Sequence, residues 1–312
     1  MSNLPHIQIF KHQNFTWYDV DKPSKKQLIW LKENLNFEAI DLDDCSPLTE
    51  RPKLIDRGHY VFLILLFPFY DKETKEIRSS EVDFFIDSEK IVTVHSGELE
   101  PIIRLTKKAG QDPEFGEKYM VNGSILLYEI LNNLLHECFP MLSHINRDID
   151  GIETNVLNVF EKRLAIITEI LRIKTNIVNF RKAMQAHKSI ISKLIKVSER
   201  FYPKNQLHLY FNNLVNHTKD IWDFLENYKD SINAIHETHE SLMSHRQTEI
   251  MKTLTVISVI VFPLTLFAAI FGMNTMTAMP FLTSKYDFWL VIAIMIFGAL
   301  SMLLVFKKKK WL

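Results

Sequence analysis

The sequence predicts an α/β N-terminal cytosolic domain followed by long helices and two C-terminal transmembrane helices. Short β-branched and aromatic segments alternate with helical patterns up to about Lys118, and from Ser124 onward only helical spacing recurs. Two uncharged apolar runs then follow, residues 253–271 and 288–306. At ~1.5 Å per residue each run reaches about 28 Å, which is enough to cross the hydrocarbon layer of a membrane.

The first part of the chain contains five segments rich in β-branched and aromatic residues, which predict strands at residues 7–10, 16–20, 60–69, 82–86 and 91–95. Residues 25–35 and 101–109 have helical spacing, the latter with a proline in its first turn. The apolar run 60–69 is too short to span a membrane and contains Pro68, so it predicts a buried central strand.

Three long helical patterns follow. Residues 124–158 should be kinked at Pro140, because a proline inside a helix loses a hydrogen bond. Residues 160–197 continue with the same spacing, and Pro203 marks a turn. Residues 205–271 predict one helix of about 100 Å that ends inside the membrane. The expected segments are a head (1–120), a helical hairpin (121–203), a stalk (204–252), a pore-lining span (253–271), an external loop (272–287), a second span (288–306) and a basic tail (307–312).

The composition of the chain limits the classes of function that we expect. The formal net charge of zero gives no reason to expect a nucleic-acid partner. Cys45 and Cys138 have no CxxC or Cys/His neighbour, which favours reduced, partly buried thiols. The sequence shows no Gly-rich phosphate loop, HExxH motif or nucleophile elbow, so we expect neither an enzyme nor an organic cofactor.

Charge at the span ends predicts the orientation. Lys307 to Lys310 directly follow the second span, and Arg246 and Lys252 precede the first, whereas the connecting loop carries a single Lys285. By the positive-inside rule both termini face the cytoplasm. We therefore expect a protein of the cell (inner) membrane that crosses the bilayer twice.

The tripeptide Gly272-Met273-Asn274, at the end of the first of two C-terminal spans, resembles the signature of the CorA family of divalent-cation (magnesium) transporters. Residues 251–255 and 263–265, Met279-Pro280 and the Lys-rich tail are also similar to that family. The resemblance covers the whole chain. It implies a funnel-shaped homopentamer in the lipid bilayer that takes up Mg²⁺, with Co²⁺ or Ni²⁺ as further candidate substrates.

A protomer with two spans cannot enclose an aqueous path alone, so a pore requires several copies around an axis. Stepping back from Gly272 by three or four residues follows one face of the first span. This predicted pore-lining stripe carries small and hydroxylated residues among larger ones: Thr248, Met251, Leu254, Thr255, Ser258, Phe262, Thr265 and Ala269. The alternative is that the small residues only allow helices to pack closely.

Asn274 is the strongest candidate for a selectivity filter, with Gly272 allowing a close backbone turn and Met273 packing behind it. Mg²⁺ sheds water reluctantly, so a ring of carboxamides can recognise the hydrated ion without trapping it. The alternative role for Asn274 is a plain helix cap.

Carboxylates recur on the predicted stalk at intervals of seven residues, at Asp223, Asp230 and Glu237. They either lower the potential along a cation's path or form an ordinary solvated face. The resemblance also implies a gating role for cytosolic Mg²⁺, which would bridge head and stalk carboxylates of neighbouring protomers. Asn213 stands where the family's acidic sensor is expected, which predicts weaker or relocated sensing. The candidate head partners are Asp71, Glu81 and Asp83.

Other departures and alternatives concern the ion. Phe281 follows Pro280 where relatives usually carry a Glu, and Thr248 stands where an Asn is common. A stalk cluster of histidines suits transition metals, but packing or surface roles are favoured for its members His236, His239 and His245.

A Zn²⁺ transporter of the same superfamily is the second hypothesis for the function, which Met273 disfavours because that branch usually has Val there. A membrane-anchored scaffold is the third.

Overall fold

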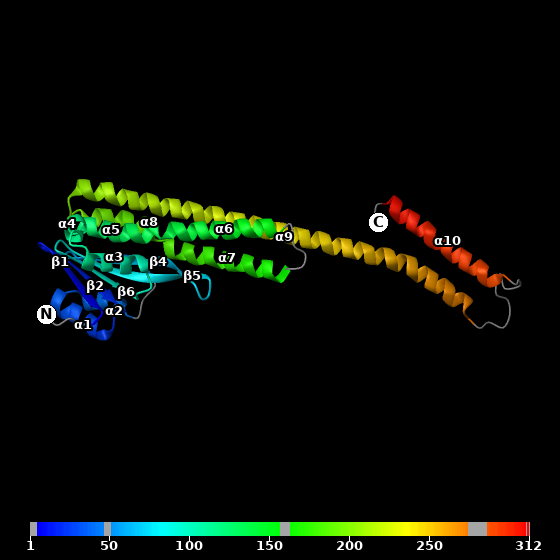
Figure 1. Cartoon of the computed structure of the whole chain (residues 1–312), viewed down its shortest axis with the longest axis horizontal. Helices are drawn as coiled ribbons and strands as arrows, with labels where there is room; N and C mark the ends of the chain where they lie inside the picture. The colour runs from blue at the N-terminus through cyan, green and yellow to red at the C-terminus, as the bar shows by residue number, and fades with distance from the viewer. Residues whose placement is uncertain (1–4, 47–50, 157–162, 274–285, 310, 312) are drawn as a thin grey trace. The chain divides into compact units, whose positions relative to one another are not determined.

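The computed structural model describes residues 5–46, 51–156, 163–273, 286–309 and 311. The chain forms two compact units, Met1–Ile235 and His236–Leu312. The first holds a sheet with helices on both faces, and the second holds the end of one long helix and the last helix (Figure 1). The predicted fold class is therefore confirmed, whereas its finer division into seven segments stays a prediction.

A six-stranded sheet lies at the centre of the first unit, in the order β1-β2-β6-β5-β4-β3. Its strands are β1 (Ile7–His12), β2 (Phe15–Asp21), β3 (Lys53–Asp56), β4 (Val61–Asp71), β5 (Glu76–Ile86) and β6 (Lys90–His95). β2 and β6 pair in parallel, and the other neighbouring strands are antiparallel. The run 60–69 is indeed a buried strand. β3 was not predicted, and β5 begins at Glu76 instead of Val82, because the β4–β5 hairpin extends a polar segment that has little strand pattern of its own.

Two short helices cover one face of the sheet (Figure 1). α1 (Lys25–Leu35) starts where the backbone N–H of Ser24 donates to Gln27 Oε1 at 3.1 Å. α2 (Ala39–Asp44), which has no predicted counterpart, brings Leu42 and Cys45 onto the sheet. Both native cysteines are buried and free, as expected.

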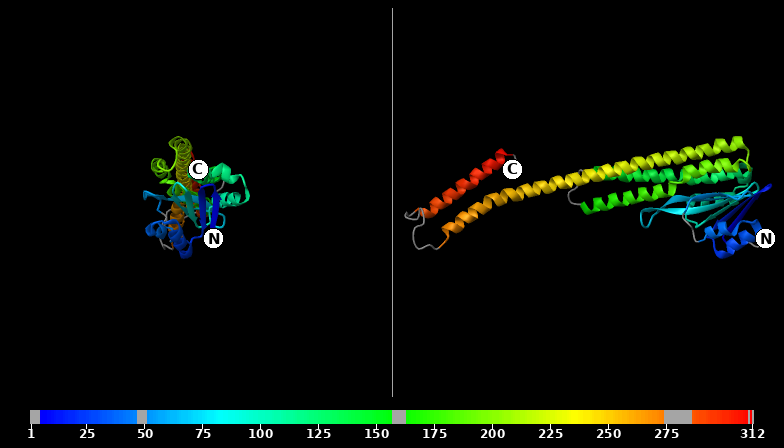
Figure 2. Two further views of the ribbon diagram at one scale, coloured as in Figure 1. Left: turned by 90° about the vertical axis from the view of Figure 1, so that its left-hand side faces the viewer. Right: turned by 180° about the vertical axis from the view of Figure 1, so that it is seen from behind.

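The remaining helices of the first unit cover the opposite face (Figure 2). They are α3 (Glu100–Gln111), α4 (Phe115–Tyr119), α5 (Gly123–His136), α6 (Cys138–Val156), α7 (Arg163–Met184), α8 (His187–Ser198) and the start of α9 (Lys204–Phe271). Alternate residues of β5, such as Val82 and Phe84, pack into one core with these helices. Phe211 and Leu225 bring α9 into the same core.

The helix breaks differ from those predicted. Pro140 does not kink a continuous helix. Instead α5 ends at His136 and α6 begins at Cys138, since Pro140 has no N–H to bond the carbonyl four residues earlier. Residues 160–197 are not one helix either, because α7 ends at Met184 and α8 begins at His187. No proline or glycine marks this break between α7 and α8 in the sequence. The predicted long helix is confirmed as α9.

Two asparagines of α7 complete the hydrogen bonding of β5. The first part of β5 extends beyond β6, which pairs only with residues 82–86. Asn176 Oδ1 accepts the backbone N–H of Ile77 at 2.9 Å, and Asn179 Nδ2 donates to the Ile77 carbonyl at 3.0 Å. Burying backbone groups without partners is costly, so these side chains fix α7 against the sheet.

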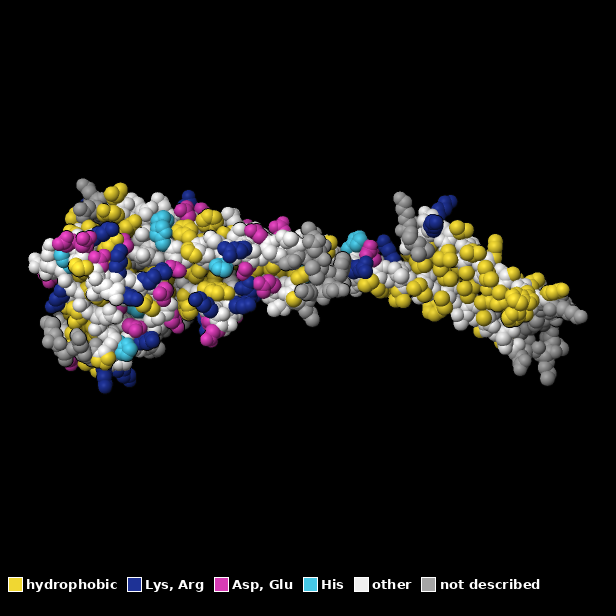
Figure 3. Space-filling view, in the orientation of Figure 1, with side chains coloured by type: hydrophobic (Ala, Val, Ile, Leu, Met, Phe, Trp, Pro, Cys, Tyr) yellow, Lys and Arg dark blue, Asp and Glu magenta, His cyan; other side chains and the backbone are white. Residues whose placement is uncertain are grey.

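In the second unit, the C-terminal part of α9 and α10 (Asp287–Lys308) are each long and apolar enough to cross a membrane. Hydrophobic side chains gather over both helices, whereas charged side chains are concentrated on the first unit (Figure 3). Phe262 and Phe297 are 72% and 75% exposed, which is unfavourable in water and suits a lipid or protein environment.

Candidate functional site

The membrane segment of α9 has two distinct faces. One side chain is buried and four are half-buried along a single stripe: Val256, Ile260, Leu264, Phe267 and Phe271. Their spacing of three or four residues puts them on one face, because a helix advances by ~100° per residue. We call this the covered stripe of α9.

The predicted pore-lining stripe lies about opposite the covered stripe. Thr248, Met251, Leu254, Thr255, Phe262, Thr265 and Ala269 are exposed, and Ser258 is half-buried. Within the described residues, this face of α9 therefore remains available for an aqueous path or for another copy of the chain.

Two threonine hydroxyls on this face, which we call the open face of α9, are bonded to their own helix. Thr255 Oγ1 donates to the Met251 carbonyl at 2.7 Å, and Thr265 Oγ1 donates to the Val261 carbonyl at 2.8 Å. Each hydroxyl gives its proton to the backbone one turn earlier, so its oxygen can still accept a hydrogen bond from a passing water molecule. These two threonines are thus accommodated in an apolar span without exposing an unsatisfied donor.

The C-terminal end of α9 is closed by backbone hydrogen bonds. Gly272 N donates to the Ala268 carbonyl at 2.9 Å, and Met273 N donates to the Ile270 carbonyl at 3.3 Å. A Cβ on Gly272 would lie 3.2 Å from the Ala268 oxygen, which is a tight contact. Met273 is 59% exposed, and its expected packing behind the filter stays a prediction. Asn274, like Phe281, lies outside the described residues.

The acidic row of the stalk faces away from the core. Asp223, Asp230 and Glu237 are all exposed. The buried side chains of α9, such as Ile221 and Ile232, lie on the opposite side of the helix. Asp230 contacts Lys229 at 3.5 Å. The row is therefore open to solvent or to neighbouring molecules.

The neighbouring Glu226 is not part of this exposed acidic row, because its carboxylate is already paired. Its carboxylate pairs with Arg181 of α7 and with Lys229, and hydrogen bonds from these two cations lower the pKa of Glu226. The Arg181 guanidinium also lies 4.8 Å from the ring centre of Trp222. These contacts tie α7 to α9.

The head candidates for a regulatory ion are separated from one another. Asp71 Oδ1 accepts the backbone N–H of Glu73 at 2.9 Å, which lowers the pKa of Asp71, and Arg78 lies 3.4 Å away. Asp83 is fully buried on the sheet face that packs against α2, beside the Cys45 thiol. Burial first, and then the negative charge of Glu81, raise the pKa of Asp83 well above its usual range.

α9 packs on the other face of the sheet from Asp83, so Asp83 and Asn213 cannot share an ion within one chain. Asn213 Nδ2 instead lies 3.3 Å from Tyr128 Oη and 3.1 Å from His217 Nε2. Within the described residues no three His, Cys, Asp or Glu side chains converge as a metal-binding group. This includes the predicted histidine cluster, where His239 is buried and His236 lies 3.4 Å from Glu240.

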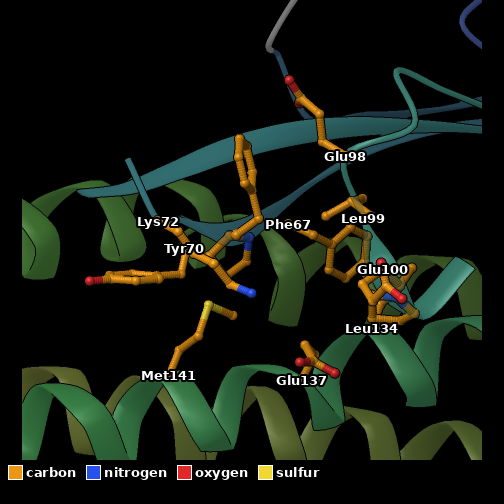
Figure 4. Close-up of a pocket in the computed structure, with 12 residues that line it drawn as sticks. Phe67, Tyr70, Lys72, Glu98, Leu99, Glu100, Leu134, Glu137 and Met141 are labelled. Carbon is orange, nitrogen blue, oxygen red and sulfur yellow. The ribbon is translucent and has the colours of Figure 1, made fainter. Parts of the chain in front are cut away.

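A cavity of about 590 Å³ opens in the first unit between the end of β4, the start of α3 and the α5–α6 junction. Its lining includes Tyr70, Met141 and three glutamates, Glu98, Glu100 and Glu137 (Figure 4). Glu98 and Glu137 lie far apart in this view. Glu137 also pairs with Arg104 at 2.5 Å, so the carboxylates do not form a common cation site.

One polar pair that the fold assembles was not predicted from the sequence. The rings of His136 on α5 and His217 on α9 lie 5.0 Å apart between centroids. Burial and the neighbouring His136 lower the pKa of His217. These histidines are too far apart in sequence for any spacing rule to connect them.

The chain thus combines an α/β unit with two membrane-length helices, the first of which is the end of the very long helix α9. The sequence pattern of the family described as "CorA-like Mg2+ transporter protein" matches residues 12–308. The chain belongs to this family. It is therefore a divalent-cation transport protein by class, not a member of an enzyme class.

One relative is similar to this chain in sequence, and two solved structures are similar to it in fold. The "Cobalt/magnesium transport protein CorA" of Thermotoga maritima is 28% identical over 300 residues, covering 95% of this chain and 83% of that protein. The complete structure of the CorA magnesium transporter from Methanocaldococcus jannaschii superposes with a TM-score of 0.83 at 20% identity, over 100% of this chain and 95% of that one. The ZntB cytoplasmic domain from Vibrio parahaemolyticus gives a TM-score of 0.55 at 13% identity, over 75% and 90%.

Proposed function

We propose that the chain forms a homopentameric channel that takes up Mg²⁺ down its electrochemical gradient and also passes Co²⁺ or Ni²⁺. The observation that carries this proposal is the open face of α9, which bears hydroxyls and small residues opposite a covered apolar stripe. The family match adds the class of substrate, and the Thermotoga maritima relative is named for both cobalt and magnesium transport.

Oligomerisation follows from the number of spans. Two helices cannot shield an aqueous path from lipid, so the open faces of several α9 helices must meet around an axis. Identical chains close most simply in a ring, and five is the number that the family resemblance implies. With both termini in the cytoplasm, the residues after α9 lie on the outer side, and Lys307 and Lys308 end α10 on the inner side.

In this proposal the carboxamides of Asn274 form a ring that hydrogen-bonds the water shell of the incoming ion. Amide oxygens are neutral, so the ion is recognised without being held so tightly that it cannot leave. Met251, Leu254 and Phe262 form apolar constrictions below the ring, at which the pore closes by losing water. A dication entering a negative interior gains roughly 4.6 kcal/mol per 100 mV.

Cytosolic Mg²⁺ gates the pore weakly in this proposal. Asn213 supplies at most one neutral oxygen, and Asp83 is buried away from α9. Asp71 remains the accessible head candidate, although a turn and Arg78 already engage its carboxylate. The exposed row of Asp223, Asp230 and Glu237 supplies negative potential along the stalk.

Ion flux into liposomes tests the proposed function. Purified protein should conduct Mg²⁺, and Asn274→Ala should lower this flux at least tenfold. Asn227→Ala makes the same change at an exposed position of α9 and should leave flux unchanged. Flux that is indifferent to Asn274→Ala would remove the filter assignment.

The same assay separates the alternatives. Zn²⁺ flux without Mg²⁺ flux would favour the Zn²⁺ transporter, for which the likeness to the ZntB domain shows only a common fold. Absence of flux with every divalent ion would favour a membrane-anchored scaffold.

A further inference from the structure

Basic side chains gather at the C-terminal end of α10, and no carboxylate accompanies them. Lys307 and Lys308 end the helix, Lys309 caps it, and all three side chains are exposed. Residues 288–312 contain no Asp or Glu. A lysine of the first unit such as Lys90 pairs with a carboxylate, whereas these three form no ion pair within the part of the chain that the structure describes. This end of α10 therefore carries uncompensated positive charge.

The backbone closes on itself at the same end of α10. The backbone N–H of Trp311 donates to the Phe306 carbonyl at 3.0 Å, and the two rings lie 5.9 Å apart between centroids. A Schellman motif has this hydrogen bond and this hydrophobic contact across the end of a helix. Trp311 is thereby held beside the last apolar turn of α10, and 43% of it stays exposed.

The three lysines do not lie on one face of the helix. Successive residues are ~100° apart around a helix, so Lys307, Lys308 and Lys309 cover more than half of its circumference. One acidic helix packed beside α10 could meet only part of this set. Phospholipid headgroups surround a spanning helix, and Lys307 directly follows the apolar run 288–306, so its ammonium group reaches the headgroups. The arrangement therefore fits a lipid surface better than a single acidic protein segment.

The other end of α10 has different chemistry. The helix begins at Asp287, and the exposed side chains around this start are the aromatic Tyr286, Phe288 and Trp289. Tyrosine and tryptophan suit a membrane–water boundary without a charged lipid, because each combines an apolar ring with one polar group. Among the described residues of α10, positive charge therefore lies only at the C-terminal end.

The membrane segment of α9 adds one cation on the same side. Lys252 is exposed and directly precedes the apolar run 253–271. Two consecutive spans cross a membrane in opposite directions, so Lys252 and Lys307 reach the same membrane surface. Arg246, farther from the apolar run, already pairs with Glu249 at 3.1 Å.

We propose that Lys307, Lys308 and Lys309, with the Trp311 indole beside them and Lys252 of α9, bind the headgroups of anionic phospholipids such as phosphatidylglycerol. Ammonium groups donate charge-assisted hydrogen bonds to phosphate oxygens. In phosphatidylcholine the choline cation offsets the phosphate, so lysines near the surface gain less from this lipid than from an anionic one.

Quenching of tryptophan fluorescence by brominated lipids tests the proposal on the full-length protein in vesicles. Trp289→Phe leaves Trp311 as the tryptophan of the membrane segments, because the other three lie in the first unit: Trp17, Trp30 and Trp222. The vesicles contain phosphatidylglycerol and phosphatidylcholine, and one of the two lipids carries bromine on its acyl chains. We expect the association constant of phosphatidylglycerol beside Trp311 to be at least about threefold that of phosphatidylcholine.

Charge variants show whether the lysines cause this preference. Lys307→Gln, Lys308→Gln and Lys309→Gln together should make the two association constants equal, whereas arginine at the same three positions should keep the preference. The matched control removes three exposed lysines of α8 by Lys188→Gln, Lys193→Gln and Lys196→Gln, and it should leave the preference unchanged.

The two ends of α10 can also be compared. Trp311→Phe in place of Trp289→Phe makes Trp289 the reporter, and there we expect no preference for phosphatidylglycerol. Equal association of both lipids beside Trp311, or a preference that survives the triple Gln replacement, would overturn the proposal. Fluorescence is measured without transport, so a failed flux assay leaves this result unaffected.

Discussion

His187 should make the stability of the first unit depend on pH. This histidine begins α8, is fully buried and meets the Phe67 ring edge-on with centroids 4.9 Å apart. Burial lowers the pKa of His187 from 6.5 to about 4. The folded protein therefore keeps the imidazole neutral at pH values where the unfolded chain binds a proton.

The sign and size of the effect follow from proton linkage. Above pH 6.5 both states hold a neutral ring, and His187 adds no pH dependence. As pH falls from 6.5 toward 4, the unfolded state gains protons that the folded state does not, so the free energy of unfolding decreases. At about 1.4 kcal/mol per pH unit, the loss is about 2 kcal/mol at pH 5 and about 3 kcal/mol when complete.

Urea unfolding of the full-length protein in detergent, followed by tryptophan fluorescence at pH 7.5 and pH 5, measures this loss. His187→Phe keeps a ring against Phe67 but removes the titrating group, so it should lose about 2 kcal/mol less than the native protein on acidification. His59→Gln is the control, because it replaces a histidine at an exposed position. Equal losses in native protein and His187→Phe would refute the reasoning.

Three further predictions concern other contacts. Asp83→Asn should stabilise the protein increasingly as pH rises above the ordinary carboxyl range, since the unfolded chain then releases the Asp83 proton while the raised pKa keeps it on the folded protein, so native stability falls; an effect independent of pH in urea unfolding would contradict this. Arg181→Gln should cost about 1 kcal/mol by removing the contacts to Trp222 and Glu226, and should speed hydrogen exchange in α7; unchanged exchange would show that these contacts do not hold the helix. Asn213→Asp should strengthen Mg²⁺-dependent protection of α9 from protease, and identical protection in both proteins would remove the sensor argument.

The long-range plan of the fold could be predicted because its signals are local and repeated. The apolar run 253–271 and the uninterrupted helical spacing before it locate α9 almost to the residue. We did not predict β3 or the break between α7 and α8, because both depend on tertiary contacts. β3 forms by pairing with β4, and no proline or glycine marks the break before His187.

The candidate site was predictable only where its residues lie on one helix. The stripe from Thr248 to Ala269 follows from helical period, and in the structure it lies opposite the covered stripe, while its role in a pore stays a prediction. The burial of Asp83 depends on how α2 covers the sheet, which no spacing in the sequence reveals. The meeting of His136 and His217 depends in the same way on how α5 packs against α9.

Thiol modification during Mg²⁺ flux tests most directly whether the open face of α9 lines the pore. The native cysteines are buried in the first unit, where burial raises the pKa of both thiols, so they should not react. A positively charged thiol reagent should block flux through Thr265→Cys and spare the adjacent Leu264→Cys, which lies on the covered stripe. Block of Leu264→Cys with Thr265→Cys left conducting would contradict the assignment.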